Sequence, residues 1–241
     1  MSLDTAVRTM IQGGRYYVLL IWGWGRQRPI HLYERRIYSQ NGEDGIIGYI
    51  FHKIGTTNRR YVEIGAGDGV QCNTRLLKRL GWSGIQIDGQ KNTGIKQHFV
   101  RADNVEQILK QYAVPLQFDL LSIDIDGNDY WIWEAIKTYE PRVVVIEYNA
   151  MLGPKKAWTI PYHHKQVWDG TDYFGASLQA LVKLGKKKGY RLIGTDSKGI
   201  NAFFVMTKLA DTYFLKEKAT DLFHPPGYAV YPHSTKNFVK V

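Results

Sequence analysis

Short apolar segments alternate with amphipathic segments along most of this chain. Strand-like runs lie at residues 60–65, 83–88, 96–103, 118–126 and 142–148, and helix-like runs at 39–54, 73–81, 104–113, 130–139 and 177–190. This alternation predicts βαβ units, in which helices cover both faces of a parallel sheet. Two more strand-like runs, 191–196 and 201–207, are too close together for a crossover and predict an antiparallel hairpin. We therefore expect an α/β fold with a Rossmann-like, doubly wound sheet of seven strands, parallel except for the last.

The chain of 241 residues is long enough for one large domain with short appendages. We expect a basic and aromatic extension at residues 1–38, the α/β domain at 39–210, and a C-terminal tail at 211–241 that packs on this domain. Residues 149–176 are an aromatic insert, and connections longer than about 12–15 residues in compact domains are usually functional. We expect this insert to act as a lid.

Basic residues are concentrated near the start of the chain. The net charge is +10, and the first sixty residues carry half of it, with nine basic and four acidic side chains. A basic arm suits nucleic acid, an anionic membrane or a negatively charged substrate, and a plain solvated surface is the alternative. The apolar run at 16–25 is shorter than the about 20 residues of a transmembrane helix. It predicts a helix packed on the domain, with peripheral membrane contact as the alternative. A single cysteine, Cys72, excludes an internal disulfide and indicates a cytoplasmic setting.

Residues 61–70 read YVEIGAGDGV and combine the end of a strand with three glycines at alternate positions. A dinucleotide-binding loop has the spacing G-x-G-x-x-G, whereas Gly65, Gly67 and Gly69 have the spacing G-x-G-x-G. Asp68 occupies the mouth of this loop, where its carboxylate would repel a phosphate. The loop therefore predicts a ligand with a cationic group, such as an ammonium or a sulfonium.

A second carboxylate points to a ribose. Asp88 ends the strand-like run 83–88 and lies 23 residues after Gly65, a spacing typical of the acid that binds ribose hydroxyls. Asp103, at the end of the next run, is suited to accept a hydrogen bond from an adenine amine. A ligand with adenine, ribose and a cationic amino-acid-like tail, but without phosphate, is S-adenosylmethionine.

These motifs resemble those of class I S-adenosylmethionine-dependent methyltransferases. The resemblance covers residues 39–207 and rests on VEIGAGDG, IQIDG, RADN, FDLLSIDIDG and the closing hairpin. It implies an enzyme whose cofactor contacts are Gln40, Glu43, Glu63, Gly65, Ala66, Gly67, Asp68, Asp88, Gly89, Asp103, Asn104 and Asp124. For Gln40 and Glu43, capping of a helix is the alternative role.

Two segments are similar to the narrower FkbM-type branch, which methylates oxygen atoms of sugars and secondary metabolites. These segments are YSQNGEDGI before the first strand and SIDIDGNDYWIW at the fourth. The branch often has a lysine ahead of its fourth-strand acid and a glutamate two residues after that acid. This chain departs from the pattern, because Ser122 and Asp126 occupy the two places.

Polar residues at the ends of the fourth and fifth strands are the candidates for catalysis. Asp124 and Asp126 follow one strand, Glu147 and Asn149 follow the next, and parallel strands end at one edge of a sheet. The four residues resemble the magnesium site of catechol O-methyltransferase-like enzymes, and oxygen ligands suit Mg²⁺ or Mn²⁺. The alternatives are that these residues form turns, or that Asp124 faces the sulfonium.

Methyl transfer to a hydroxyl also needs a proton acceptor. Asp124 and Asp126 are candidates for this role. In the insert, His163 or His164 is a further candidate for the general base, and the alternative is that both are surface histidines without a catalytic role. Aromatic residues of the insert suggest apolar walls for an acceptor, and Lys155, Lys156 and the basic arm suggest that the acceptor is anionic.

We expect an O-methyltransferase acting on a small molecule, sugar or glycan, with or without a divalent ion. One alternative is an RNA methyltransferase that uses the basic N-terminal arm. Another is a non-catalytic scaffold that retains the cofactor site.

Overall fold

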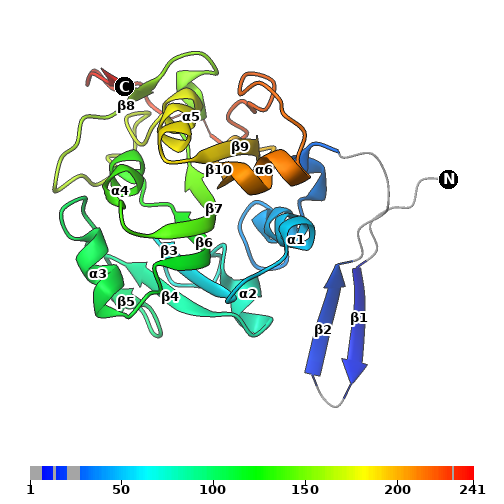
Figure 1. The fold of residues 1–241 in the computed structure, drawn as a ribbon. Helices are drawn as coiled ribbons and strands as arrows, with labels where there is room; N and C mark the ends of the chain where they lie inside the picture. The colour runs from blue at the N-terminus through cyan, green and yellow to red at the C-terminus, as the bar shows by residue number, and fades with distance from the viewer. Residues whose placement is uncertain (1–6, 13–14, 21–27, 230) are drawn as a thin grey trace.

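A seven-stranded sheet forms the centre of the protein (Figure 1). The computed structural model describes residues 7–12, 15–20, 28–229 and 231–241. The strand order is β5-β4-β3-β6-β7-β10-β9. The strands are β3 (Arg60–Ile64), β4 (Ser83–Asp88), β5 (Lys96–Gln97), β6 (Gln117–Ile123), β7 (Glu140–Glu147), β9 (Tyr190–Thr195) and β10 (Asn201–Met206).

Strand β10 runs against its two neighbours, and every other pair of neighbouring strands in this sheet is parallel. It lies between β7 and β9, so that Asn201 pairs with Glu147 and Met206 pairs with Tyr190. This arrangement confirms the predicted Rossmann-like sheet of seven strands with one antiparallel strand. One strand is shorter than predicted, since β5 has two residues where the sequence suggested a strand within 96–103.

Both faces of the sheet are buried because the strands are apolar on both sides. In β7, Val143 and Val145 belong to one core cluster, and Val144 and Ile146 belong to the other. Helices cover the two faces, as Figure 1 shows. The first cluster includes residues of α1 (Glu43–Ile54), α2 (Arg75–Arg79) and α6 (Thr207–Tyr213), and the second includes residues of α3 (Val105–Gln111), α4 (Asp129–Ala135) and α5 (Leu178–Lys187).

The N-terminal part differs from the prediction. Strands β1 (Val7–Gln12) and β2 (Arg15–Leu20) form an antiparallel pair of their own, so the helix predicted for 16–25 is wrong over residues 16–20. Residues 21–25 lie outside the described part of the chain. Tyr16, Tyr17 and Val18 belong to residue types that favour strands. Among the described residues, no helix is long and apolar enough to cross a membrane.

The C-terminal segment lies along the insert. Strand β11 (Val239–Lys240) pairs with β8 (Trp158–Thr159) in the insert. The Tyr173 hydroxyl donates to the carbonyl of Asn237 at 3.3 Å, and the Asp172 carboxylate accepts from the backbone of Ser234 at 2.7 Å. Two short 3-10 helices, η1 (Ile30–Tyr33) and η2 (Ala150–Leu152), complete the described elements.

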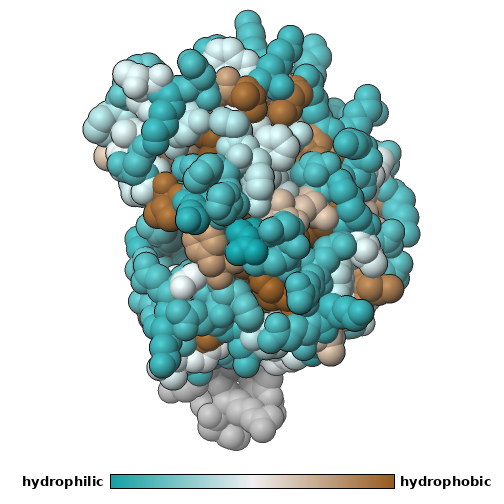
Figure 2. All heavy atoms as spheres, turned by 90° about the vertical axis from the view of Figure 1, so that its left-hand side faces the viewer, coloured by the Kyte–Doolittle hydropathy of each residue, from teal (hydrophilic) through white to brown (hydrophobic). Residues whose placement is uncertain are grey.

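The surface seen in Figure 2 is mainly hydrophilic, and its hydrophobic patches are small and separate. The large exposed apolar side chains of the described residues come from different parts of the chain, with Val167 68%, Leu215 60% and Leu116 57% exposed. The face in Figure 2 therefore has no broad apolar area.

Candidate functional site

The glycine loop after β3 packs closely against the neighbouring strand ends. Gly65, Gly67 and Gly69 have φ values of +87°, +55° and +75°, which favour glycine. The backbone amides of Gly65 and Ala66 donate to the carbonyl of Ile87 in β4, at 2.9 and 3.1 Å. The glycines thus allow the chain to turn at the carboxyl end of the sheet.

Asp88 joins this loop to the end of β4. One carboxylate oxygen accepts from the backbone of Gly67 at 2.8 Å, and the other accepts from the backbone of Gln90 at 2.8 Å. Each oxygen keeps capacity for a further donor, because an ionised carboxylate has about four acceptor positions. Asp88 lines the main cleft together with Gly89.

The main cleft has a volume of about 1110 Å³ and opens at the carboxyl ends of the parallel strands, the usual ligand position in such sheets. A side chamber of about 180 Å³ adjoins it through shared lining residues. Gln40, Gly65, Gly67, Asp68 and Asp124 line both spaces, while Glu43, Glu63 and Ala66 line the chamber.

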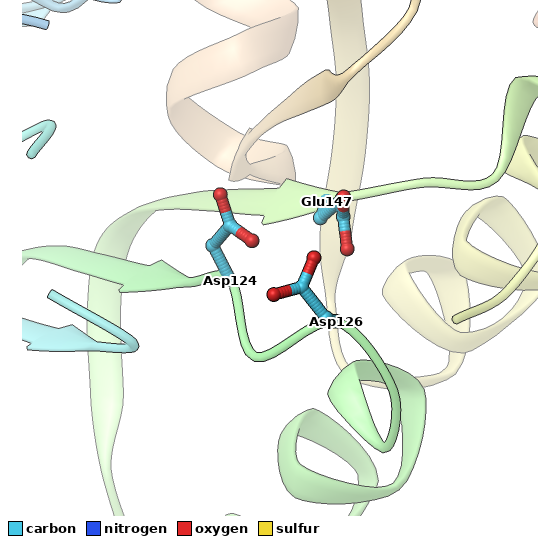
Figure 3. A group of neighbouring side chains, drawn as sticks. All are labelled: Asp124, Asp126 and Glu147. Carbon is cyan, nitrogen blue, oxygen red and sulfur yellow. The ribbon is translucent and has the colours of Figure 1, made fainter. Parts of the chain in front are cut away.

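Three carboxylates converge at one end of the cleft. Asp124 and Asp126 follow β6, Glu147 ends β7, and the three side chains point toward one another (Figure 3). Their ligand oxygens lie within 4.8 Å of one another. Three carboxylates at this spacing can bind a divalent cation through oxygen ligands.

The turn that carries Asp126 is held in an uncommon conformation. Asp126 has a φ of +54°, which costs a non-glycine residue of the order of 1–3 kcal/mol and tends to occur at functional sites. The buried carboxylate of Asp129 fixes the turn, since its two oxygens accept from the backbones of Ile125 and Gly127, both at 2.9 Å. Asp129 therefore positions Asp126.

Burial and mutual repulsion disfavour the charged forms of these acids. Burial raises the pKa of Asp124, and Asp126 and Asp129 raise it further. Burial, followed by Asp124, raises the pKa of Glu147. Burial likewise raises the pKa of Asp129 to about 6, and it is the main cause of the raised pKa of Asp126. A bound cation would relieve this repulsion.

These shifts predict how stability depends on pH. An acid with a raised pKa binds more protons in the folded than in the unfolded chain between its ordinary and its raised pKa, so stability falls as the pH rises through that interval. Burial also raises the pKa of Asp196 to about 7, against an ordinary value of 3.8. In chelator-containing buffer we expect the thermal unfolding midpoint to fall as the pH increases from about 5 to about 8. Glu147→Gln should flatten the dependence, and a midpoint that rises over this interval would contradict the pKa assignments.

Several predicted site residues lie outside the cleft lining. Asp103 is exposed and paired with Arg101 at 2.8 Å, because the chain leaves the sheet after Gln97. Asn104 instead occupies the N-cap position of α3, and its side-chain oxygen accepts from the backbone of Arg101 at 2.7 Å. His163 and His164 are exposed on the insert and do not line the cleft.

Other predicted site residues have side chains that are hydrogen-bonded to nearby backbone groups. The buried carboxylate of Glu63 accepts from the backbone of Asn73 at 2.7 Å and from the Thr74 hydroxyl at 2.5 Å, just before α2. Glu43 accepts from the backbone of Asn41 at 2.8 Å. The structure does not bring Asn149 to the three carboxylates, because its amide donates to the carbonyls of residues 172 and 174 and its oxygen caps η2.

The cleft also contains residues that the sequence alone did not indicate. They include Gln90, His98, Phe99 and Val100, and also Asn128, Gln166, Phe174, Lys198, Tyr228 and Tyr231. Trp168 lines the cleft too, but it is one of the aromatic residues of the insert that suggested apolar walls. No pattern in the sequence pointed to Tyr228 or Tyr231, because they approach the cleft from the C-terminal segment.

No protein-family model and no functionally curated protein matches this sequence. Among solved structures, the pyocyanin biosynthetic protein PhzM is 13% identical, with a TM-score of 0.37, and the match covers 66% of this chain and 54% of PhzM. A candidate hemolysin from Lactococcus lactis is 13% identical, with a TM-score of 0.40 and coverage of 71% and 90%. A SAM-dependent methyltransferase from Aquifex aeolicus is 10% identical, with a TM-score of 0.34 and coverage of 66% and 89%.

This chain thus spans about half the length of PhzM and most of the length of the other two. Likenesses at these scores carry no conclusion about activity.

Proposed function

We propose that this protein is an S-adenosylmethionine-dependent methyltransferase that methylates a hydroxyl of a small molecule, sugar or glycan. The observation that carries the proposal is the acidic cleft at the carboxyl ends of the strands, where the glycine loop is hydrogen-bonded to Asp88. Among the residues that the structure describes, five carboxylates line this cleft, from Asp68, Asp88, Asp124, Asp126 and Glu147. Such a lining suits a cationic ligand and opposes the pyrophosphate of a dinucleotide.

The residues present fit this cofactor. Asp88 is suited to a ribose, and Phe99 offers an aromatic ring, 46% exposed, beside Gly89 in the cleft. Apart from Gly67 itself and the two adjacent residues, no heavy atom of the described chain lies within 4 Å of the position a Cβ would take there, so the backbone is open to a ligand. When bound, S-adenosylmethionine supplies a methyl group on a sulfonium, and Asp124 is placed at the junction of the two spaces.

The carboxylate cluster is the proposed acceptor side. Asp124, Asp126 and Glu147 would hold Mg²⁺ or Mn²⁺, which orients a hydroxyl and lowers its pKa. Without an ion, one of these groups in its ionised carboxylate form would accept the proton, since a raised pKa makes the carboxylate a stronger base. His163 and His164 lie on the exposed insert, and therefore we favour the carboxylates for this role.

Calorimetry with S-adenosylhomocysteine tests the cofactor assignment. We expect binding by the native protein, and Asp88→Ala should weaken it by about 1–3 kcal/mol, because a charged acceptor is lost. Asp103→Ala is the matched control and should bind normally, since Asp103 lies outside the cleft lining. Tight binding of NAD with no binding of S-adenosylhomocysteine would refute the proposal.

The other functions have less support. An RNA acceptor would bring phosphates to a cleft lined by carboxylates, which would repel them. The basic N-terminal arm is the single feature that favours an RNA acceptor. A scaffold without activity needs neither the strained turn at Asp126 nor the clustered acids. A cytoplasmic location remains part of the proposal.

A further inference from the structure

Four aromatic side chains form a wall of the cleft, which we call the aromatic wall: Trp168, Phe174, Tyr228 and Tyr231. Tyr231 is at its centre, with ring-centroid distances of 4.9 Å to Trp168, 6.1 Å to Phe174 and 5.6 Å to Tyr228. Two of these residues come from the insert and two from the C-terminal segment. The wall therefore exists only because these two segments meet.

Hydrogen bonds hold Trp168 and the backbone next to Tyr228. The Trp168 indole donates to the carbonyl of Thr171 at 2.8 Å. The backbone of Gly227, next to Tyr228, donates to the carbonyl of Lys198 at 2.7 Å. An aromatic surface of this kind is suited to the flat face of a ring.

The aromatic wall and the carboxylate cluster line the same cleft. Burial raises the pKa of Tyr231, and the charges of Glu147 and Asp126 raise it further. Burial also raises the pKa of Tyr228, followed by Glu147. A ring lying on the wall would thus place its substituents near these acids.

Two buried acceptors beside the wall have no donor. Asn128 is 3% exposed and lines the cleft, and its amide nitrogen donates to the carbonyl of His163 at 2.9 Å. Its side-chain oxygen has no hydrogen-bond partner within the described chain, and neither does one carboxylate oxygen of Glu147. Buried acceptors without donors are costly, so a ligand that completes the site brings hydrogen-bond donors.

The charge of the cleft lining gives further information about the ligand. Lys198 is the one lysine or arginine among the described residues of the cleft, against five carboxylates, and neither Lys155 nor Lys156 lines it. A divalent ion in the cluster would take up two negative charges, which leaves the lining acidic. An anionic acceptor would be repelled here, and a cationic one attracted.

We propose that the acceptor is a hydroxylated ring that carries an ammonium group, bound with one face on the aromatic wall and its donors toward Asn128 and Glu147. That this ligand is a methyl acceptor rests on the proposed function. The experiment below measures only whether the ligand binds. It replaces the anionic acceptor that the basic residues of the chain suggested.

Three matched sugars test the proposal: glucosamine, glucose and glucuronate, which are cationic, neutral and anionic at neutral pH. Binding of each sugar is measured by ligand-observed NMR in the presence of S-adenosylhomocysteine, once with Mg²⁺ and once without it. The Mg²⁺ contains no Mn²⁺. We expect glucosamine to bind at least about tenfold more tightly than glucuronate, with glucose between them. Tighter or equal binding of glucuronate, or no binding of glucosamine, overturns the proposal.

Variants locate the site. Tyr231→Ala should lower glucosamine affinity about tenfold, as expected for the loss of a stacking surface, whereas Tyr231→Phe should retain it. Tyr213→Ala, at an exposed tyrosine of α6 outside the cleft, is the control. Equal glucosamine affinity in Tyr231→Ala and native protein contradicts the aromatic wall as the binding surface. Binding of S-adenosylhomocysteine, followed in the same samples, reports separately on the proposed function.

Discussion

Replacing Gly65 by alanine should abolish binding of S-adenosylhomocysteine and destabilise the domain by about 2–5 kcal/mol, the sum of a left-handed backbone cost and overpacking. A Cβ at Gly65 would lie 1.5 Å from the carbonyl oxygen of Asp124. Because that oxygen belongs to the backbone, either the glycine loop or the end of β6 must move. Both carry residues of the proposed site. Chemical denaturation and calorimetry measure the two effects.

Gly81→Ala is the matched control. Gly81 has a φ of +83°, almost the same as Gly65, but beyond its adjacent residues no atom of the described part of the chain lies within 4 Å of its added Cβ. It should therefore show only the conformational cost, about 1–2 kcal/mol, with normal ligand binding. If Gly65→Ala were as mild as Gly81→Ala, the close packing of the loop on β6 would be refuted.

Removing one carboxylate from the cluster should remove the metal site. Free Mn²⁺ gives a distinct electron paramagnetic resonance signal, so binding can be followed without knowledge of the acceptor. We expect the native protein to bind one ion, and Glu147→Gln to lower the affinity at least about tenfold, since Mn²⁺ prefers charged oxygen ligands. Asp126→Asn should have a similar effect and should leave S-adenosylhomocysteine binding nearly unchanged.

Asp68→Asn provides the control for net charge. Asp68 lines the cleft but does not belong to the cluster of three carboxylates, so Mn²⁺ binding should persist. Equal Mn²⁺ affinity in Glu147→Gln and native protein would refute the assignment of Glu147. No binding by the native protein would exclude the metal and leave a carboxylate as the proton acceptor. Once an acceptor is known, turnover in EDTA should distinguish the same two cases.

Local patterns were sufficient to predict the sheet. β4 occupies the predicted residues 83–88, and the hairpin of β9 and β10 lies where two apolar runs are separated by a turn. Hydrophobic period and turn chemistry act over a few residues, and the handedness of βαβ units then restricts the topology. Asp124, Asp126 and Glu147 meet because they follow or end neighbouring parallel strands, and parallel strands end at one edge of the sheet. At residues 16–20 the apolar run was interpreted as part of a helix, although Tyr16, Tyr17 and Val18 favour strands, and the prediction was wrong there.

Tertiary contacts decided the rest of the candidate site. Asn149 is only two residues from Glu147, yet its side chain holds the insert, and Asp103 leaves the cleft because β5 ends early. Conversely, Tyr228 and Tyr231 reach the cleft from a segment that follows the whole sheet in sequence. Periodicity and motif spacing describe neighbours along the chain. Packing between the insert and the C-terminal segment depends on burial and on hydrogen bonds between residues about sixty positions apart. Examples are Asp172 with Ser234 and Tyr173 with Asn237. Only the folded chain brings such residues together.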